Sequence, residues 1–281
     1  MSTKTLDAPP SLIALYAKAG VTGPLHRGDS LPDSLYELAP QPIDVRHLAA
    51  YDRVCGFGFG DVLPPTYLHV LAFPLQVALM SERAFPFPLV GLVHVANSVT
   101  VQRPVTVSER VAFTVRAGDL RPHPAGRQLD LLTTVTVDGE PVWSGCSTYL
   151  RRGGASERSG AKKTAAVPGG ASAQVRVPGD VGRRYGAVSG DRNPIHLYGL
   201  TAKAFGFPSA IAHGMWLKAR TLATLQGRLP DAFTADVTFK TPVLLPSTVA
   251  ITAGREADGW TLDVRNSRTG KPHLTGAITP L

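Results

Sequence analysis

Two long apolar stretches, residues 66–80 and residues 214–228, stand out along the chain and predict one buried helix in each half. The first is apolar on most sides, which is typical of a helix wrapped by other structure, and Pro74 predicts a kink or a break within it. The second places its apolar side chains at helical spacing on one broad face, namely Met215, Ala219, Leu222, Leu225 and Leu229.

Short segments with strand-like alternation follow each of these helices. Turn sequences such as Asp138–Gly139 and Thr269–Gly270 join neighbouring segments, which favours antiparallel pairing. The pattern therefore predicts an α+β fold in which a curved antiparallel sheet surrounds a central helix, and this unit occurs twice. The predicted strands are residues 111–116, 128–137, 142–150, 234–239, 248–253, 260–264 and 274–278.

Weak internal similarity supports a duplication. The segment from Tyr51 matches that from Tyr185 (185 − 51 = 134), and the segment from Val99 matches that from Val237 (237 − 99 = 138). A third match, from Gly139 to Gly270, has a similar offset (270 − 139 = 131). Three matches in the same order at nearly constant spacing indicate two related folding units.

The segment at residues 152–174 separates these units. It is rich in Gly, Ala, Ser and Lys and has no apolar period, so we expect a flexible connector. The predicted organisation is an N-terminal unit at residues 1–151, the connector, and a C-terminal unit at residues 175–281.

Composition narrows the class of protein. With 43% hydrophobic and 18% charged residues, the 281-residue chain resembles a soluble globular protein, and no apolar run reaches the length of a membrane span. The first twelve residues do not resemble a secretory signal, and Cys55 and Cys146 are too few for a disulfide scaffold, so we expect a cytoplasmic protein. The net charge of +8 suits an anionic cofactor or an acidic carrier protein, whereas no nucleic-acid-binding signature accompanies it.

The candidate chemistry lies in the segment Ser189-Gly-Asp-Arg-Asn-Pro-Ile-His196. It places the Asp191 carboxylate and the His196 imidazole five residues apart on a loop stiffened by Pro194, and such a pair suits proton transfer. His213–Gly214 then begins the second apolar helix, where free N–H groups can hold a developing oxyanion. Taken alone, the same loop residues also fit an ordinary turn or helix cap.

The two segments SGDRNPIH and AKAFGFPSAIAHGM resemble the signature of MaoC-like dehydratases, the group of R-specific enoyl-CoA hydratases called hydratase 2. Along its whole length the chain is similar to actinobacterial double-hotdog 3-hydroxyacyl-thioester dehydratases. The resemblance implies a degenerate N-terminal hotdog and a catalytic C-terminal hotdog.

Carried over by position, the resemblance makes Asp191 and His196 the catalytic pair and Gly214 the donor to the thioester oxygen. Asn193 falls on a supporting polar position, and Ser189 and Tyr185 are weaker supporting candidates. Tyr185 recurs as Tyr51, which favours a packing role, and a histidine at a helix start such as His213 is more often a structural donor than a ligand contact.

The chain departs from the family pattern in two places. Tyr198–Gly199 stands where relatives often have an Asp or Asn followed by Pro. The N-terminal half has Phe57 and Val62 where the repeat would place Asp191 and His196, so we expect that half to supply structure and part of an acyl-chain tunnel.

The expected activity is reversible syn addition of water to a trans-2-enoyl thioester, giving the (3R)-3-hydroxyacyl thioester. CoA or the pantetheine of an acyl-carrier protein enters as part of the substrate, and neither a metal nor a redox cofactor is expected. A hotdog thioesterase and a non-catalytic acyl-CoA or acyl-carrier-binding protein remain as alternatives. Two hotdogs in one chain suit either a monomeric pseudo-dimer or a homodimer.

Overall fold

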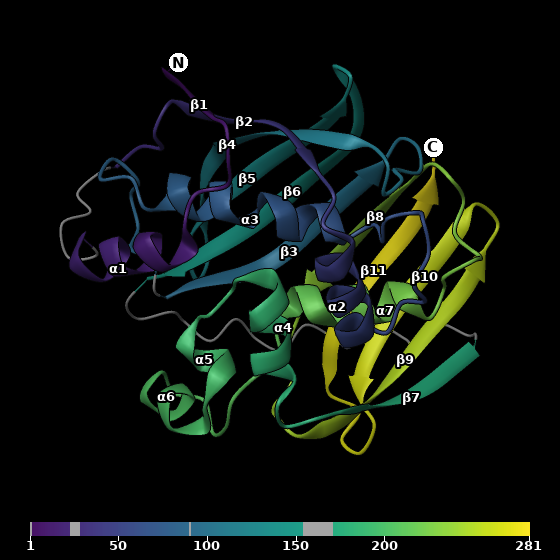
Figure 1. Cartoon of the computed structure of the whole chain (residues 1–281). Helices are drawn as coiled ribbons and strands as arrows, with labels where there is room; N and C mark the ends of the chain where they lie inside the picture. The colour runs from purple at the N-terminus through teal and green to yellow at the C-terminus, as the bar shows by residue number, and fades with distance from the viewer. Residues whose placement is uncertain (1, 23–28, 90, 154–170) are drawn as a thin grey trace.

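The computed structural model describes residues 2–22, 29–89, 91–153 and 171–281 (Figure 1). Its helices are α1 (Leu12–Thr22), α2 (Val45–Cys55), α3 (Tyr67–Met80), α4 (Val181–Ser189), α5 (Pro194–Leu197), α6 (Gly199–Ala204) and α7 (Gly214–Ala223). Its strands are β1 (Ser2–Leu6), β2 (Ser34–Pro42), β3 (Leu92–Val101), β4 (Arg110–His123), β5 (Gly126–Val137), β6 (Glu140–Arg152), β7 (Ala171–Val177), β8 (Phe233–Phe239), β9 (Ser247–Glu256), β10 (Gly259–Asn266) and β11 (Pro272–Pro280).

One continuous 11-stranded sheet runs through the described residues, in the order β1-β2-β4-β5-β6-β3-β8-β11-β10-β9-β7. Its neighbours pair in antiparallel fashion except β1 and β2, which are parallel. Figure 1 shows α3 lying across the strands of the N-terminal half and α7 across those of the C-terminal half. The predicted pair of helix-wrapped sheets is confirmed, and the two sheets join edge to edge through β3 and β8.

The join between β3 and β8 follows the predicted duplication. Ser98 pairs with Asp236, and these two residues are equivalent under the repeat offset of 138 (236 − 98 = 138). A residue that pairs with its own equivalent marks the position of a two-fold relation between the halves. Tyr51 and Tyr185, another equivalent pair, also meet near this relation, with ring centroids 6.3 Å apart.

The central helices are close to their predicted extents. Helix α3 continues through Pro74, so the chain does not break there even though proline cannot donate to the carbonyl of Val70. Burial on almost every side, including Leu75 and Leu79 at 0% exposure, holds α3 together. Helix α7 ends at Ala223, five residues earlier than predicted, and hydrogen-bonded turns continue from there.

Two predicted boundaries need correction. Residues 171–174 were expected in the flexible connector but form the start of β7, which pairs with β9, and Arg152 ends β6. Backbone pairing gives these residues a partner that their composition does not reveal. Residues 154–170 of the connector lie outside the described residues. The sequence pattern did not predict strands β1, β2 and β3.

In the described part of the chain no helix is both long and apolar enough to cross a membrane. Both cysteines are free thiols: Cys55 is buried and Cys146 is partly buried.

A buried lysine joins the two halves at the sheet seam. Lys218 of α7 is fully buried, and its Nζ donates to the Oδ1 of Asn97 on β3 at 2.6 Å and to the carbonyl oxygens of Asn97 and Ala235 at 3.1 and 2.8 Å. Three acceptors match the three protons of an ammonium group. Burial nevertheless lowers the pKa of Lys218 to about 7, and nearby Asp236 opposes that effect.

We expect the free energy of unfolding to depend on pH through Lys218. Because the folded pKa lies below the unfolded value, the unfolded chain binds more protons between about pH 7 and pH 10, and stability rises with pH there. The slope for one proton is at most about 1.4 kcal/mol per pH unit. Urea unfolding of wild type and Lys218→Met from pH 7 to 9 should show the wild type gaining relative to the variant. Exposed Lys203→Met should keep the wild-type slope, and parallel curves for wild type and Lys218→Met would contradict this account.

Candidate active site

The loop that carries Asp191 is shaped by short-range hydrogen bonds. Helix α4 ends at Ser189 and is capped by Gly190, whose left-handed φ of +73° suits glycine and whose N–H donates to the Gly186 carbonyl. The Ser189 hydroxyl then accepts the Asp191 N–H at 3.2 Å, and Asp191 Oδ1 accepts the Asn193 N–H at 3.2 Å. These turns occupy Asp191 Oδ1 and leave Asp191 Oδ2 without a hydrogen bond from the loop backbone.

Asn193 begins the next helix. Its side-chain oxygen accepts the Ile195 N–H as the N-cap of α5, and Pro194 occupies the first helical position, where a missing N–H costs nothing. Ser189 and Asn193 therefore set the backbone on either side of Asp191. Their supporting roles in a reaction stay predictions.

His196 lies in α5 with its ring nitrogens in different environments. Nδ1 is 2.9 Å from the carbonyl oxygen of Ile211, so Nδ1 must carry the proton and donate it. Nε2 is then an unprotonated acceptor. Burial lowers the pKa of His196 below its usual value, and Asp191 and the Ile211 carbonyl only partly oppose this. The ring is therefore neutral at pH 7.

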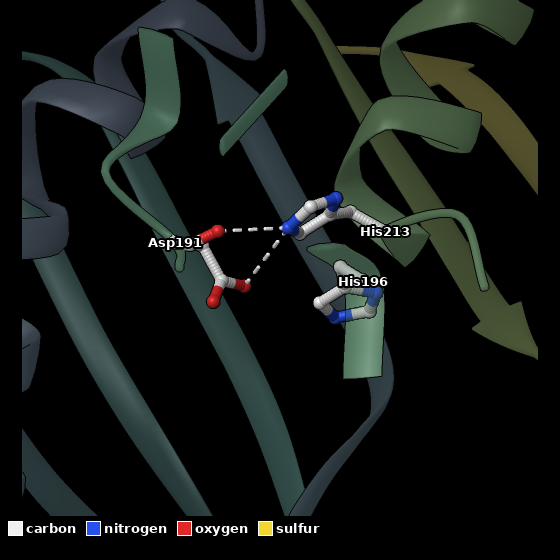
Figure 2. Close-up of side chains that lie close together, drawn as sticks. All are labelled: Asp191, His196 and His213. Atoms are coloured by element: carbon white, nitrogen blue, oxygen red, sulfur yellow. Dashed lines mark hydrogen bonds and ion pairs between the residues drawn. The ribbon is translucent and has the colours of Figure 1, made fainter. Parts of the chain in front are cut away.

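His213, which sequence reasoning treated as a structural donor, lies against both predicted catalytic residues (Figure 2). Its Nε2 is 2.9 Å from the Asp191 carbonyl oxygen and 3.8 Å from Asp191 Oδ2. Its ring stacks on the His196 ring, with centroids 3.7 Å apart and planes at 26°. Burial is the main cause and the electrostatic effect of a nearby second imidazole, His196, is the next; together they lower the pKa of His213 to about 3, so His213 is neutral as well.

The site is open at Asp191 and closed at His213, and His196 is partly exposed. The Asp191 side chain is 31% exposed, whereas that of His213 is 3% exposed. Tyr185 closes the back of the cluster, with its ring centroid 4.9 Å from that of His213. Because Tyr185 is buried, the pKa of its hydroxyl is raised well above the usual value, which suits packing rather than proton transfer.

Gly214 is the first residue of α7 and follows His213 directly. Its N–H belongs to the first turn of the helix, where amides have no carbonyl partner within the helix. A Cβ at this position would lie 3.0 Å from the Phe239 ring, so only glycine fits without displacing that ring. The structure thus places the predicted oxyanion donor next to the acid–base cluster.

Two glycines that sequence reasoning missed allow the loop to pack this closely. A Cβ on Gly182 of α4 would overlap the carbonyl oxygen of His196, and one on Gly186 would lie 2.9 Å from the carbonyl oxygen of Asp191. Helix α1 also reaches the loop, because the Tyr16 hydroxyl donates to the Gly190 carbonyl at 3.3 Å. Close approaches of this kind have no signal in a single sequence.

Among the described residues of the N-terminal half there is no equivalent cluster. Phe57, at the position equivalent to Asp191, is buried and packs with its ring centroid 6.3 Å from that of Tyr51. Val62, at the position equivalent to His196, is 54% exposed. Neither side chain can exchange a proton, so of these equivalent positions only those of the C-terminal half hold a candidate acid–base pair.

The cluster is also a set of potential metal ligands, since one ligand-capable atom from each of Asp191, His196 and His213 lies within 4.8 Å of the others. In this arrangement His196 Nδ1 and His213 Nε2 both face carbonyl oxygens. Figure 2 shows the second ring nitrogen of His213 on the side away from Asp191. A metal would therefore have to displace at least the His213 hydrogen bond, and the donor set suits proton transfer better.

Comparisons with known proteins agree with this geometry. The sequence profile of the family described as "MaoC like domain" matches residues 164–276. The chain is 38% identical to 3-hydroxyacyl-thioester dehydratase X of Mycobacterium tuberculosis over 272 residues, covering 95% of this chain and 96% of that protein.

Solved structures extend the comparison to the fold. The crystal structure of HtdX of Mycobacterium tuberculosis superposes with a TM-score of 0.79 at 38% identity, covering 88% of this chain and all of that one. A second protein of that organism, described as a double hotdog, matches with a TM-score of 0.57 at 13% identity, covering 86% of this chain and 93% of its own, and supports the fold alone. The near full-length relationship, together with the MaoC-like match over the half that carries Asp191 and His196, shows that this chain belongs to the MaoC-like dehydratase family, as a double-hotdog member.

Proposed function

We propose that this protein catalyses the reversible hydration of trans-2-enoyl thioesters to (3R)-3-hydroxyacyl thioesters. The observation that carries the proposal is that Asp191 and His196 lie together, with one ligand-capable atom of each within 4.8 Å of the other. Each offers a proton acceptor: Asp191 Oδ2, which accepts no hydrogen bond from its own loop, and Nε2 of a neutral His196. A water molecule held between them can lose a proton as its oxygen attacks an alkene carbon.

The reaction balances with these groups. As the water oxygen bonds to C3 of the enoyl group, one of the two acceptors takes the water proton, and electrons move through C2 to the thioester oxygen. The Gly214 N–H stabilises the resulting enolate oxygen, a role in which the loss of one donor costs roughly 10²–10³ in rate in other enzymes. The protonated group then returns the proton to C2 on the same face, which gives syn addition.

The substrate and setting follow from the same chemistry. The thioester carrier is CoA or the pantetheine of an acyl-carrier protein, and the net charge of +8 favours either anionic carrier. We propose a cytoplasmic enzyme without a metal or redox cofactor, since proton transfer alone completes the reaction. The β3–β8 join already pairs two hotdogs within one chain, so a monomeric pseudo-dimer suffices, and a homodimer of such units is the alternative.

Replacing Asp191 with Asn should abolish most of the hydration activity. The amide keeps the size of the side chain and still offers an oxygen to the Asn193 N–H, but it cannot take up a proton, so kcat should fall by about 10²-fold or more. The measurement is the loss of enoyl absorbance with crotonyl-CoA and a longer trans-2-enoyl-CoA, with chiral analysis of the product.

Asp258→Asn, an exposed change in the turn between β9 and β10, is the matched control and should retain wild-type rates. Release of free CoA thiol without hydration would instead support the thioesterase. Tight binding of both substrates without any turnover would leave a binding protein.

The pH profile should report the lowered pKa of His196. Hydration needs Nε2 unprotonated, so the acidic limb of kcat/KM should be centred below 6.5, the usual pKa of a histidine. Initial rates with crotonyl-CoA between pH 5 and 8 test this. An acidic limb centred at or above 6.5 would contradict a His196 that burial keeps neutral.

A further inference from the structure

We propose that His213 is a positioning residue for this reaction. Its Nε2–H holds the Asp191 backbone, and so keeps the Asp191 carboxylate in place relative to the His196 ring. The inference rests on the proposed hydration, and it assigns a function to the cluster member that the resemblance does not place in the catalytic pair.

The contacts of His213 connect three separate elements. It occupies the N-cap position of α7, its Nε2 faces the Asp191 carbonyl oxygen at 2.9 Å, and its ring stacks 3.7 Å from that of His196 on α5. A carbonyl oxygen only accepts, so Nε2 carries the ring proton and donates it. One side chain therefore fixes both reacting groups relative to the helix that presents the Gly214 N–H.

The His213 N–H also determines which oxygen of the Asp191 carboxylate faces the reacting groups. Asp191 Oδ1 is occupied by the Asn193 N–H, while Oδ2 lies 3.8 Å from His213 Nε2. Anchoring the Asp191 backbone at its carbonyl keeps Oδ2 on the side of the two imidazoles, as Figure 2 shows. Without that anchor, the partly exposed loop is free to turn the carboxylate toward solvent. Small displacements of reacting groups are costly in enzymes: about 1 Å can lose 10²-fold in rate.

A packing role alone does not explain a histidine at this position. Within the described residues, His213 Nδ1 is buried and has no hydrogen-bond partner, an arrangement that opposes folding. A phenylalanine ring is also planar, although somewhat larger, so it could stack on His196 and contact Tyr185, and it would remove the unpartnered nitrogen. Of the two ring nitrogens, Nε2 is the one with a polar partner among the described residues, the carbonyl oxygen of Asp191.

His213 also stays neutral while it donates this hydrogen bond to Asp191. Its burial and the neighbouring His196 both disfavour protonation, and its pKa is lowered to about 3. Its tautomer is therefore constant over the pH range in which the enzyme would work. It acts as a fixed donor and does not exchange protons with the substrate.

The decisive experiment compares His213→Phe with His213→Gln in the full-length protein. Phenylalanine keeps the stacking and loses the donor, so kcat for crotonyl-CoA hydration should fall by about 10- to 100-fold, with KM changed by less than about threefold, because the residue positions reacting groups and does not bind substrate. Glutamine places an N–H near the position of Nε2, so it should recover most of the lost kcat.

Thermal unfolding of the same proteins separates positioning from packing. We expect the unfolding temperature of His213→Phe to change little, because removal of the unpartnered nitrogen offsets the larger ring, whereas kcat falls. A purely structural residue would behave otherwise: the unfolding temperature and kcat would fall together, and glutamine would rescue neither. That outcome, or an unimpaired His213→Phe enzyme, overturns the proposal.

A spectroscopic readout checks the tautomer directly. In ¹⁵N-histidine-labelled protein, His213 should show a protonated Nε2 and an unprotonated Nδ1, unchanged from pH 5 to 8. A His213 ring that titrates in this range, or that carries its proton on Nδ1, overturns the proposal. If the wild-type protein hydrates no enoyl thioester, the proposed function itself fails, which differs from an active wild type whose His213 variants are unaffected.

Discussion

The antiparallel pairing of β3 with β8 is the interaction on which the rest of this structure depends. Each half alone would present a long unpaired strand edge, and joining the two edges satisfies both while making one sheet that can surround two helices. Ser98 pairs with its repeat equivalent Asp236 at the centre of this join. The register of the β3–β8 pairing places the site loop and α7 against the inner face of the N-terminal half.

The join between β3 and β8 also explains why a lysine is buried in the core. Lys218 is an amphipathic side chain in a position where burial opposes its charge, yet its three donors reach Asn97 and Ala235 on the two strands that join the halves. A hydrogen-bonding group at this point requires both strands to be in register. The lysine therefore couples the central helix of one half to the edge strand of the other.

Duplication followed by divergence leaves the two halves with different tasks. The C-terminal half keeps the acidic loop and the histidines, whereas the N-terminal half places Phe57 and Val62 at the equivalent positions. The N-terminal half still contributes to the site environment. Tyr51 meets Tyr185 behind the cluster, and Tyr16 of α1 binds the carbonyl of Gly190 beside Asp191. The half without the candidate acid–base pair thus supports the loop that carries that pair.

The sequence by itself determined the two-unit organisation, the two central helices, most of the strands and the residues Asp191, His196 and Gly214 as candidates. These features depend on local periodicity, turn chemistry and short-range spacing, which a linear pattern records. Only the tertiary structure decided the β3–β8 join, the start of β7 within the supposed connector, and the positions of Gly182 and Lys218. The tautomers of His196 and His213 likewise depend on carbonyl groups 15 and 22 residues away along the chain. Contacts between distant segments leave no periodicity, so they can be read only once the chain has folded.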